Sequence, residues 1–206
     1  MSNVSRLQTP LHMRTIILAS LAAAFLLIGC ASTKVETTGS LLKEPLCQAD
    51  RPVVSTLVYW GTKWRPDQKE PPLREAAALR GIQDFLGRAG CLSVVAVNRL
   101  TMEPLPSNED LIRLASSMNP KPGRVLLVVV RELGPRLLLG IPVIVEGGTE
   151  VLIDVRVLDT KTSQSLATTQ TLWRNGGALV IKGVKTLDQD MSAALGSTLM
   201  LDQAAR

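Results

Sequence analysis

The chain has 206 residues, of which 46% are hydrophobic, 20% are charged and 3% are aromatic, and its formal charge is +5. These values fit one ordinary globular domain with a short additional segment. They exclude an acidic disordered chain, a collagen-like repeat and a protein with several membrane spans.

A targeting segment occupies residues 1–29. Residues 15–29 (TIILASLAAAFLLIG) form an apolar run behind the basic Arg14, shorter than the span of about 20 apolar residues that crosses a bilayer. The run ends in Leu27–Cys30 (LIGC), which resembles the lipobox of bacterial lipoproteins. The resemblance implies a cleaved signal peptide and a mature chain that begins at Cys30, whose thiol carries diacylglyceryl, with palmitate as a typical acyl chain. An internal cysteine after an uncleaved signal anchor is the alternative.

The same resemblance implies a location in the cell envelope. Two or three acyl chains would hold the protein on its membrane almost permanently. Ala31 follows Cys30, where inner-membrane lipoproteins often have Asp, so the likeness favours the periplasmic face of the outer membrane over the inner membrane. The start of translation stays open between Met1 and Met13, because Met13-Arg14 alone supplies a basic start.

The remaining chain divides into a linker and one domain. Residues 31–52 mix Ser, Thr, charges and Pro with little apolar periodicity. We therefore expect residues 30–52 to form the lipidated Cys and a flexible tether, and residues 53–206 to form a single periplasmic α/β domain.

Hydrophobic patterning predicts six strands and three helices in the order β-α-β-α-β-β-β-β-α. The strands are expected at residues 53–60, 92–100, 124–133, 136–145, 149–158 and 164–174, and the helices at 73–89, 108–118 and 186–199. The run 124–133 is nearly all aliphatic, as in a central strand covered on both faces, and Gly134-Pro135 is expected to end it. This order predicts an α/β (α+β) fold, in which two or three helices cover one face of a single mixed β-sheet.

The element order and residues 151–162 (VLIDVRVLDTKT) resemble a group of envelope proteins. The group comprises the N-terminal domain of the Tol-system β-propeller protein, the curli-secretion lipoprotein and the penicillin-binding-protein activators. The likeness is architectural and spans about residues 53–204, and it implies an accessory role in assembly, activation or secretion. The apolar hairpin near Leu137 departs from a minimal version of that fold.

Two cysteines remain after Cys30. In an oxidising periplasm Cys47 and Cys91 are predicted to form a disulfide. Two separate buried thiols are the alternative.

No catalytic or cofactor signature is found in the sequence. His12 is its single histidine and lies in the targeting segment, which excludes Ser-His-Asp and Cys-His catalysis and deprives zinc of its commonest nitrogen ligand. Lys and Arg are interleaved with Asp and Glu rather than clustered, which argues against nucleic-acid binding. We therefore expect a protein that is not an enzyme and that has no metal, cofactor or nucleic-acid partner.

The expected function is contact with another envelope component. Partner-binding residues are predicted in the loop 61–72 with the strand before it, and in the hairpin 136–148, namely Trp60, Trp64, Leu137, Leu138, Leu139 and Ile141. Both Trp residues could instead cap the sheet edge. An alternative function is an accessory of lipid or solute transport whose hairpin lines a groove for an acyl chain. The identity of the envelope partner and self-association into a homo-oligomer stay open.

Overall fold

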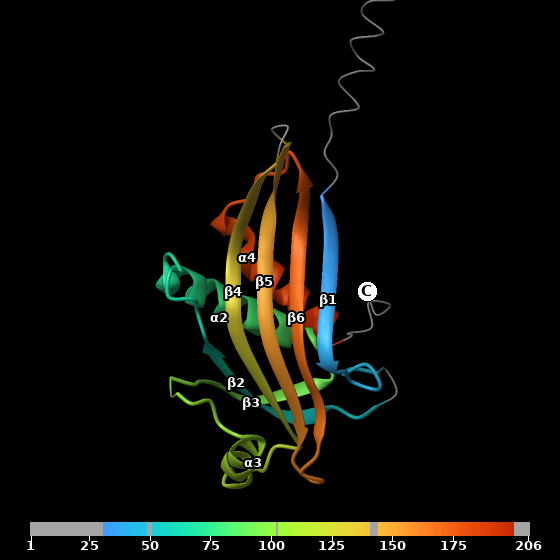
Figure 1. The fold of residues 1–206 in the computed structure, drawn as a ribbon. Coiled ribbons are helices and arrows are strands. Elements are labelled where there is room, and N and C mark those ends of the chain that lie inside the picture. Colours follow the sequence, from blue (N-terminus) through green and yellow to red (C-terminus); the bar gives the residue numbers. More distant parts are fainter. Residues whose placement is uncertain (1–30, 49–50, 102, 141–143, 200–206) are drawn as a thin grey trace, which may run out of the picture. The chain divides into compact units, whose positions relative to one another are not determined.

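The computed structural model describes residues 31–48, 51–101, 103–140 and 144–199, and its strands form one mixed sheet (Figure 1). The strands are β1 (Ser32–Ser40), β2 (Val54–Thr62), β3 (Leu92–Arg99), β4 (Arg124–Gly140), β5 (Ile144–Asp159) and β6 (Ser165–Ala178). Their spatial order is β1-β6-β5-β4-β2-β3. β2 runs parallel to β3 and β4, whereas the other pairs are antiparallel. The predicted single mixed sheet is confirmed.

Helices cover both faces of this sheet, not one as expected. α2 (Pro71–Arg88) and α4 (Leu187–Thr198), which follows the 3-10 turn η1 (Val184–Thr186), pack in one hydrophobic core. α3 (Asn108–Ser116) packs in a second core. The reason lies in β4, where Leu126 and Val128 belong to the first core and Val125 and Leu127 to the second. Because side chains alternate along a strand, an aliphatic strand needs cover on both faces.

β4 continues through Gly134 and Pro135, so the predicted break at these residues is wrong. The expected strands 124–133 and 136–145 are largely one strand, and residues 149–158 lie in its antiparallel partner β5. The parallel partner β2 pairs only as far as Thr62 opposite Val130. Beyond that point β4 is at a sheet edge on this side, where a proline without an amide hydrogen is tolerated.

β1 corrects the expectation of a flexible tether. Ser32–Ser40 pairs antiparallel with β6 over its whole length and forms the outer strand of the sheet (Figure 1). The hydroxyl groups of Thr37 and Thr171 lie 3.1 Å apart across the pair. The strand covers the polar edge of β6 with backbone hydrogen bonds and needs no apolar pattern of its own, so sequence periodicity does not reveal it.

Candidate functional site

The strand register aligns one end of the sheet with the start of β1. Arg136 of β4 pairs with Gly148 of β5, Gly148 pairs with Gly176 of β6, and Gly176 pairs with Ser32 of β1. β4 and β6 continue beyond this row toward the β4–β5 hairpin, and β1 enters the row from the same side. Ser32, the first residue of β1, therefore lies at the end of the sheet that carries the β4–β5 hairpin.

This end of the sheet is rich in exposed apolar side chains. We call them the tip surface, and they are between 45% and 82% exposed: Leu137, Leu138, Leu139, Leu179 and Ile181. Leu137 and Leu139 alternate with Leu138 along β4, so both faces of the hairpin carry leucine. Isolated exposed leucines are ordinary on soluble proteins, whereas several exposed leucines at one end of a sheet are a candidate contact surface.

The two segments of the tip surface are held together by backbone contacts. The amide of Leu179 donates to the carbonyl of Val145 at 2.7 Å, and Val145 is the register partner of Leu139. Gly147 lies beneath, where a Cβ would be 3.3 Å from a methyl group of Leu137 and would overlap the carbonyl of Val180. The segment after β6 thus packs on the hairpin because residue 147 has no side chain.

Among the predicted partner-binding residues, the structure supports the three leucines as surface groups. Leu137, Leu138 and Leu139 are exposed, whereas Ile141 and Cys30 lie outside the described residues. Leu179 and Ile181 were missed by the prediction. The apolar run 178–181 (ALVI) was the available signal, but its position beside the hairpin follows only from tertiary structure.

Trp60 does not present its ring to a partner, which corrects that expectation. Its side chain is 4% exposed and belongs to the core between the sheet and α2. The guanidinium of Arg99, on the edge strand β3, lies 5.4 Å from the ring centroid, a cation–π distance. The alternative of a tryptophan that caps the sheet near its edge describes Trp60 better.

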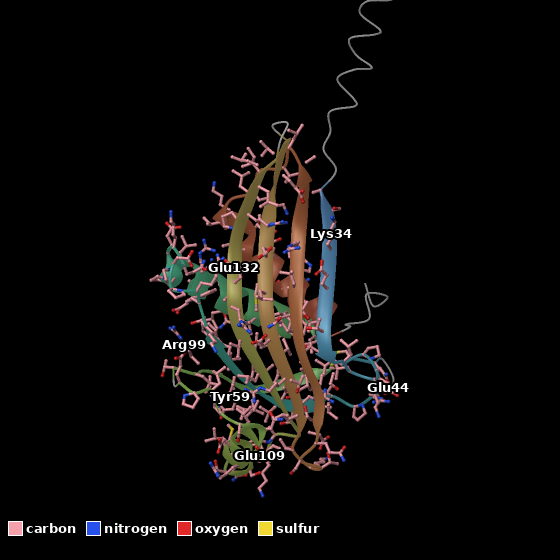
Figure 2. All side chains as sticks on the ribbon, viewed as in Figure 1. Lys34, Glu44, Tyr59, Arg99, Glu109 and Glu132 are labelled. Atoms are coloured by element: carbon pink, nitrogen blue, oxygen red, sulfur yellow. A yellow bond between two sulfur atoms is a disulfide. The ribbon has the colours of Figure 1, made fainter. Side chains whose placement is uncertain are left out.

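Trp64 and its loop are tied to β4. Trp64 is half-buried and packs against the same core as Trp60. Arg65 Nη2 lies 3.0 Å from Glu132 Oε2, and Gln68 Nε2 donates to Glu132 Oε1 at 3.3 Å. Glu132 is labelled in Figure 2 on β4. These contacts hold the loop after β2 against the sheet, so it is less available to a partner than its composition suggests.

Cys47 and Cys91 form the predicted disulfide, with their Cα atoms 5.3 Å apart. The bond joins the segment after β1 to the residue that precedes β3. It fixes the loop that leads from the outer strand β1 to β2, at the opposite end of β1 from the tip surface.

Within the described part of the chain, no three His, Cys, Asp or Glu side chains lie together as metal ligands. In the same residues no helix has the length and apolar character that would let it cross a bilayer.

No protein-family model matches the chain, and no curated protein matches its sequence. Among solved structures it is similar to the PelC dodecamer of Paraburkholderia phytofirmans, with 15% identity, a TM-score of 0.42, and coverage of 84% of this chain and 100% of that chain. It is similar to lipoprotein GNA1162 of Neisseria meningitidis, with 16% identity, a TM-score of 0.38 and coverage of 70% and 96%. It is also similar to the hypothetical protein CT253 of Chlamydia trachomatis, with 13% identity, a TM-score of 0.42 and coverage of 71% and 91%. These values describe a partial likeness of fold and say nothing of function.

Proposed function

We propose that this chain is a lipid-anchored envelope protein that acts without catalysis, by contact with other envelope components, and that its tip surface rests on the membrane that holds its anchor. Cys30 carries the acyl groups. The domain is then fixed to the bilayer at two places, the lipidated N-terminus and the tip surface.

The observation that carries the proposal is the register across β4, β5, β6 and β1. Ser32 lies in the same row as Arg136, one residue before Leu137. Cys30 precedes Ser32 by two residues, so their Cα atoms are at most about 7.6 Å apart. An acylated Cys30 would therefore bring the membrane surface to the end of the sheet that carries the exposed leucines.

The chemistry of the tip surface suits the boundary between lipid headgroups and acyl chains. Full burial of a Leu or Ile side chain stabilises by about 1.5–3 kcal/mol, so partial burial of five such side chains is worth several kcal/mol. Lys182 directly follows Ile181, and a basic residue beside apolar ones favours an anionic lipid surface. Arg136, which directly precedes the leucines, is instead paired with Glu150.

Two points of attachment would also fix the orientation of the domain. β1 is paired from Ser32 onward, so few flexible residues remain between Cys30 and the sheet. The β5–β6 turn and α3 would then face away from the membrane, toward envelope partners. A short anchor raises the effective concentration of such partners at the membrane.

The anchor is tested by metabolic labelling with palmitate. The native chain should be labelled and recovered with membranes, whereas Cys30→Ser should lose the label and be released. An unlabelled native chain in the soluble fraction would contradict the proposal.

The membrane contact of the tip surface is tested separately with an environment-sensitive fluorophore on an introduced cysteine. Leu139→Cys and Ile181→Cys carry the fluorophore in the lipidated protein, and Thr168→Cys serves as the control because Thr168 is exposed and pairs with the far end of β1. Brominated lipids should quench the label at 139 and 181 and leave that at 168 bright. Equal signals at all three positions would contradict the contact.

The accessory role is tested by in-cell cross-linking and identification of captured envelope proteins. The native chain should capture a reproducible partner, and Cys30→Ser, which no longer reaches the membrane, should lose it. Leu138→Asp should weaken the capture by disturbing the membrane-bound orientation. Identical cross-links from all three chains would contradict action at the membrane.

A further inference from the structure

β3 is an open edge of the sheet. It pairs with β2 on its inner side, and among the residues that the structure describes no strand pairs with its outer side. Its sequence, LSVVAVNR, has one charged residue, Arg99 at the end, and Val94 near its centre is 38% exposed. The other edge strand, β1, carries Lys34 and Glu36, which are charges of the kind that protect a sheet edge from pairing. β3 lacks this protection.

A β-bulge in β3 restricts which strand can pair with this edge. The carbonyl of Cys91 and the amide of Leu100, at the two ends of β3, bond to backbone groups of β2 at 2.8 and 2.7 Å. Backbone groups of successive residues point to alternate edges of a strand. Steps of two from Cys91 and from Leu100 therefore bring both Val95 and Ala96 to the β2 side. The β2–β3 register shifts at this place, as it does at a bulge.

The outer edge of β3 consequently has an irregular spacing. The backbone groups of Val94 and Val97 face outward, and these residues are three apart instead of two. Their register partners on β2, Thr56 and Val58, are two apart, so both valine side chains lie on one face of the sheet. A regular strand does not match this spacing, which is why a bulge ordinarily blunts an edge. A second copy of β3 carries the same bulge and does match it.

Two copies of β3 are complementary when they run antiparallel. Val94 of each copy then lies opposite Val97 of the other, and the two bulges meet at the two-fold axis. Apolar pairs of this kind stabilise a sheet, and the pair covers the exposed Val94 side chain. Arg99 lies opposite Leu92 of the other copy, so no like charges oppose each other across the pair.

The sheet at β3 is oriented so that such a pair keeps both copies the same way up. Val58 of β2 belongs to the core under α2, and Leu57 to the core under α3, so the two helices cover opposite faces here. In Figure 1, α3 lies below β2 and β3, whereas α2 and the tips of β4 and β5 lie above them. The two-fold axis of an antiparallel pair is perpendicular to its sheet, so it runs from α3 toward α2. Both tip surfaces then point the same way.

We propose that this chain forms a two-fold homodimer in which β3 of one copy pairs antiparallel with β3 of a second copy and joins their sheets. The interface is isologous, since the same strand is used on both sides. The orientation of the axis lets the anchors of both copies enter one membrane. The dimer itself rests on the geometry of β3 and does not depend on the membrane contact proposed above.

Native mass spectrometry of the full lipidated chain, released from detergent micelles, tests the stoichiometry. At micromolar concentration the mass should be that of two chains. The mass of one chain, or of more than two, would overturn the proposal.

Introduced cysteines test the register. Ser93 lies opposite Asn98 of the second copy, and both side chains are exposed. Ser93→Cys/Asn98→Cys should form a covalent dimer on mild oxidation, whereas each single variant should not. Thr33→Cys/Thr38→Cys is the matched control, because it places exposed cysteines at the same spacing on β1, and it should stay monomeric on a non-reducing gel. A yield from the β3 pair no higher than that from the control would overturn the proposal.

A charge at the centre of the interface tests its strength. Val94→Lys should raise the dimer dissociation constant at least tenfold in analytical ultracentrifugation, because it opposes a lysine to Val97. Val35→Lys is the control, since Val35 is an exposed valine of the β1 edge. An unchanged dissociation constant in Val94→Lys would overturn the proposal, and if this variant does not fold, the cysteine pair decides. Leu139→Asp in the tip surface should leave the dimer intact, which separates failure of the dimer from failure of the membrane contact.

Discussion

The guanidinium of Arg74 on α2 occupies the space where Gly134 on β4 would carry a Cβ. Its Nη1 atom donates to the carbonyl of Leu133 and lies 3.4 Å from Glu132 Oε1, and its Nε donates to the carbonyl of Lys69 at 2.7 Å. Arg74 is 8% exposed, so these contacts satisfy a charge that would otherwise be costly to bury. Gly134, which looks like a strand breaker in the sequence, is what lets α2 dock on β4.

Gly134→Ala should therefore destabilise the fold. The new Cβ would overlap Arg74 and force it from its carbonyl and carboxylate partners, at a cost of about 2 kcal/mol. Urea denaturation measures this loss. Gly87→Ala is the matched control, because nothing lies within 4 Å of a Cβ at 87 and alanine in a helix is favoured by up to about 1 kcal/mol. Equal free energies of unfolding for the two variants would show that the Arg74 side chain can move away from residue 134 without loss of stability.

Reduction of the Cys47–Cys91 disulfide should lower the free energy of unfolding. The bond closes a loop with a sequence separation of 44, which corresponds to about 4 kcal/mol in the chain-entropy model. Urea denaturation with and without dithiothreitol measures the difference. The double variant Cys47→Ser/Cys91→Ser should match the reduced protein and be insensitive to dithiothreitol. A native chain that is equally stable under both conditions would argue against a stabilising bond.

β1 should be protected from amide hydrogen exchange. Successive amides of an edge strand point alternately to the neighbouring strand and to solvent, so about half of the amides in Ser32–Ser40 should exchange slowly. Val35→Pro and Glu36→Pro remove adjacent amides, and one of the two must delete a hydrogen bond to β6 and unprotect the strand. Mass spectrometry of exchanged peptides distinguishes them. Rapid exchange of all amides in β1 of the native chain would contradict the pairing with β6 and indicate a flexible tether.

The N-terminus of α3 should depend on pH through Asp110. Hydrogen bonds from the side chain and amide of Ser107, with help from Arg113, outweigh desolvation and hold the pKa of Asp110 below its ordinary value of 3.8. A lowered pKa stabilises the fold above pH 3.8, and this contribution is lost as the pH falls through the folded-state value. Asp110→Asn should therefore lower the Tm at pH 7, and the difference should shrink below pH 3.8.

Glu109→Gln is the control for this pH effect, because it removes a charge from the same helical turn without removing the Asp110 hydrogen bonds. Its effect on the Tm at pH 7 should be smaller than that of Asp110→Asn. If the Tm difference between Asp110→Asn and the native chain were the same at pH 7 and pH 2, ionisation of Asp110 would not be its cause.

Several features of this protein follow from residues that are close together in the sequence. The aliphatic run at 124–133 predicted a strand covered on both faces, and β4 is such a strand. Ser107 and Asp110, three residues apart, form a capping box at the start of α3, with the Asp110 amide donating to the Ser107 hydroxyl at 3.1 Å. The lipobox resemblance at Leu27–Cys30 also rests on adjacent residues alone. Each of these features depends on neighbours in the chain, which a sequence displays directly.

The other features were decided by tertiary structure, because each of them depends on residues that are distant in the sequence and lie together in the fold. β1 is a strand because it pairs with the edge of β6, and Gly134 in β4 leaves the space that the Arg74 side chain of α2 fills. The tip surface unites Leu139 with Leu179, and the bulge in β3 is set by its pairing with β2. Pairing of backbone groups and burial of charge are properties of the folded neighbourhood, so no local pattern could have placed these sites.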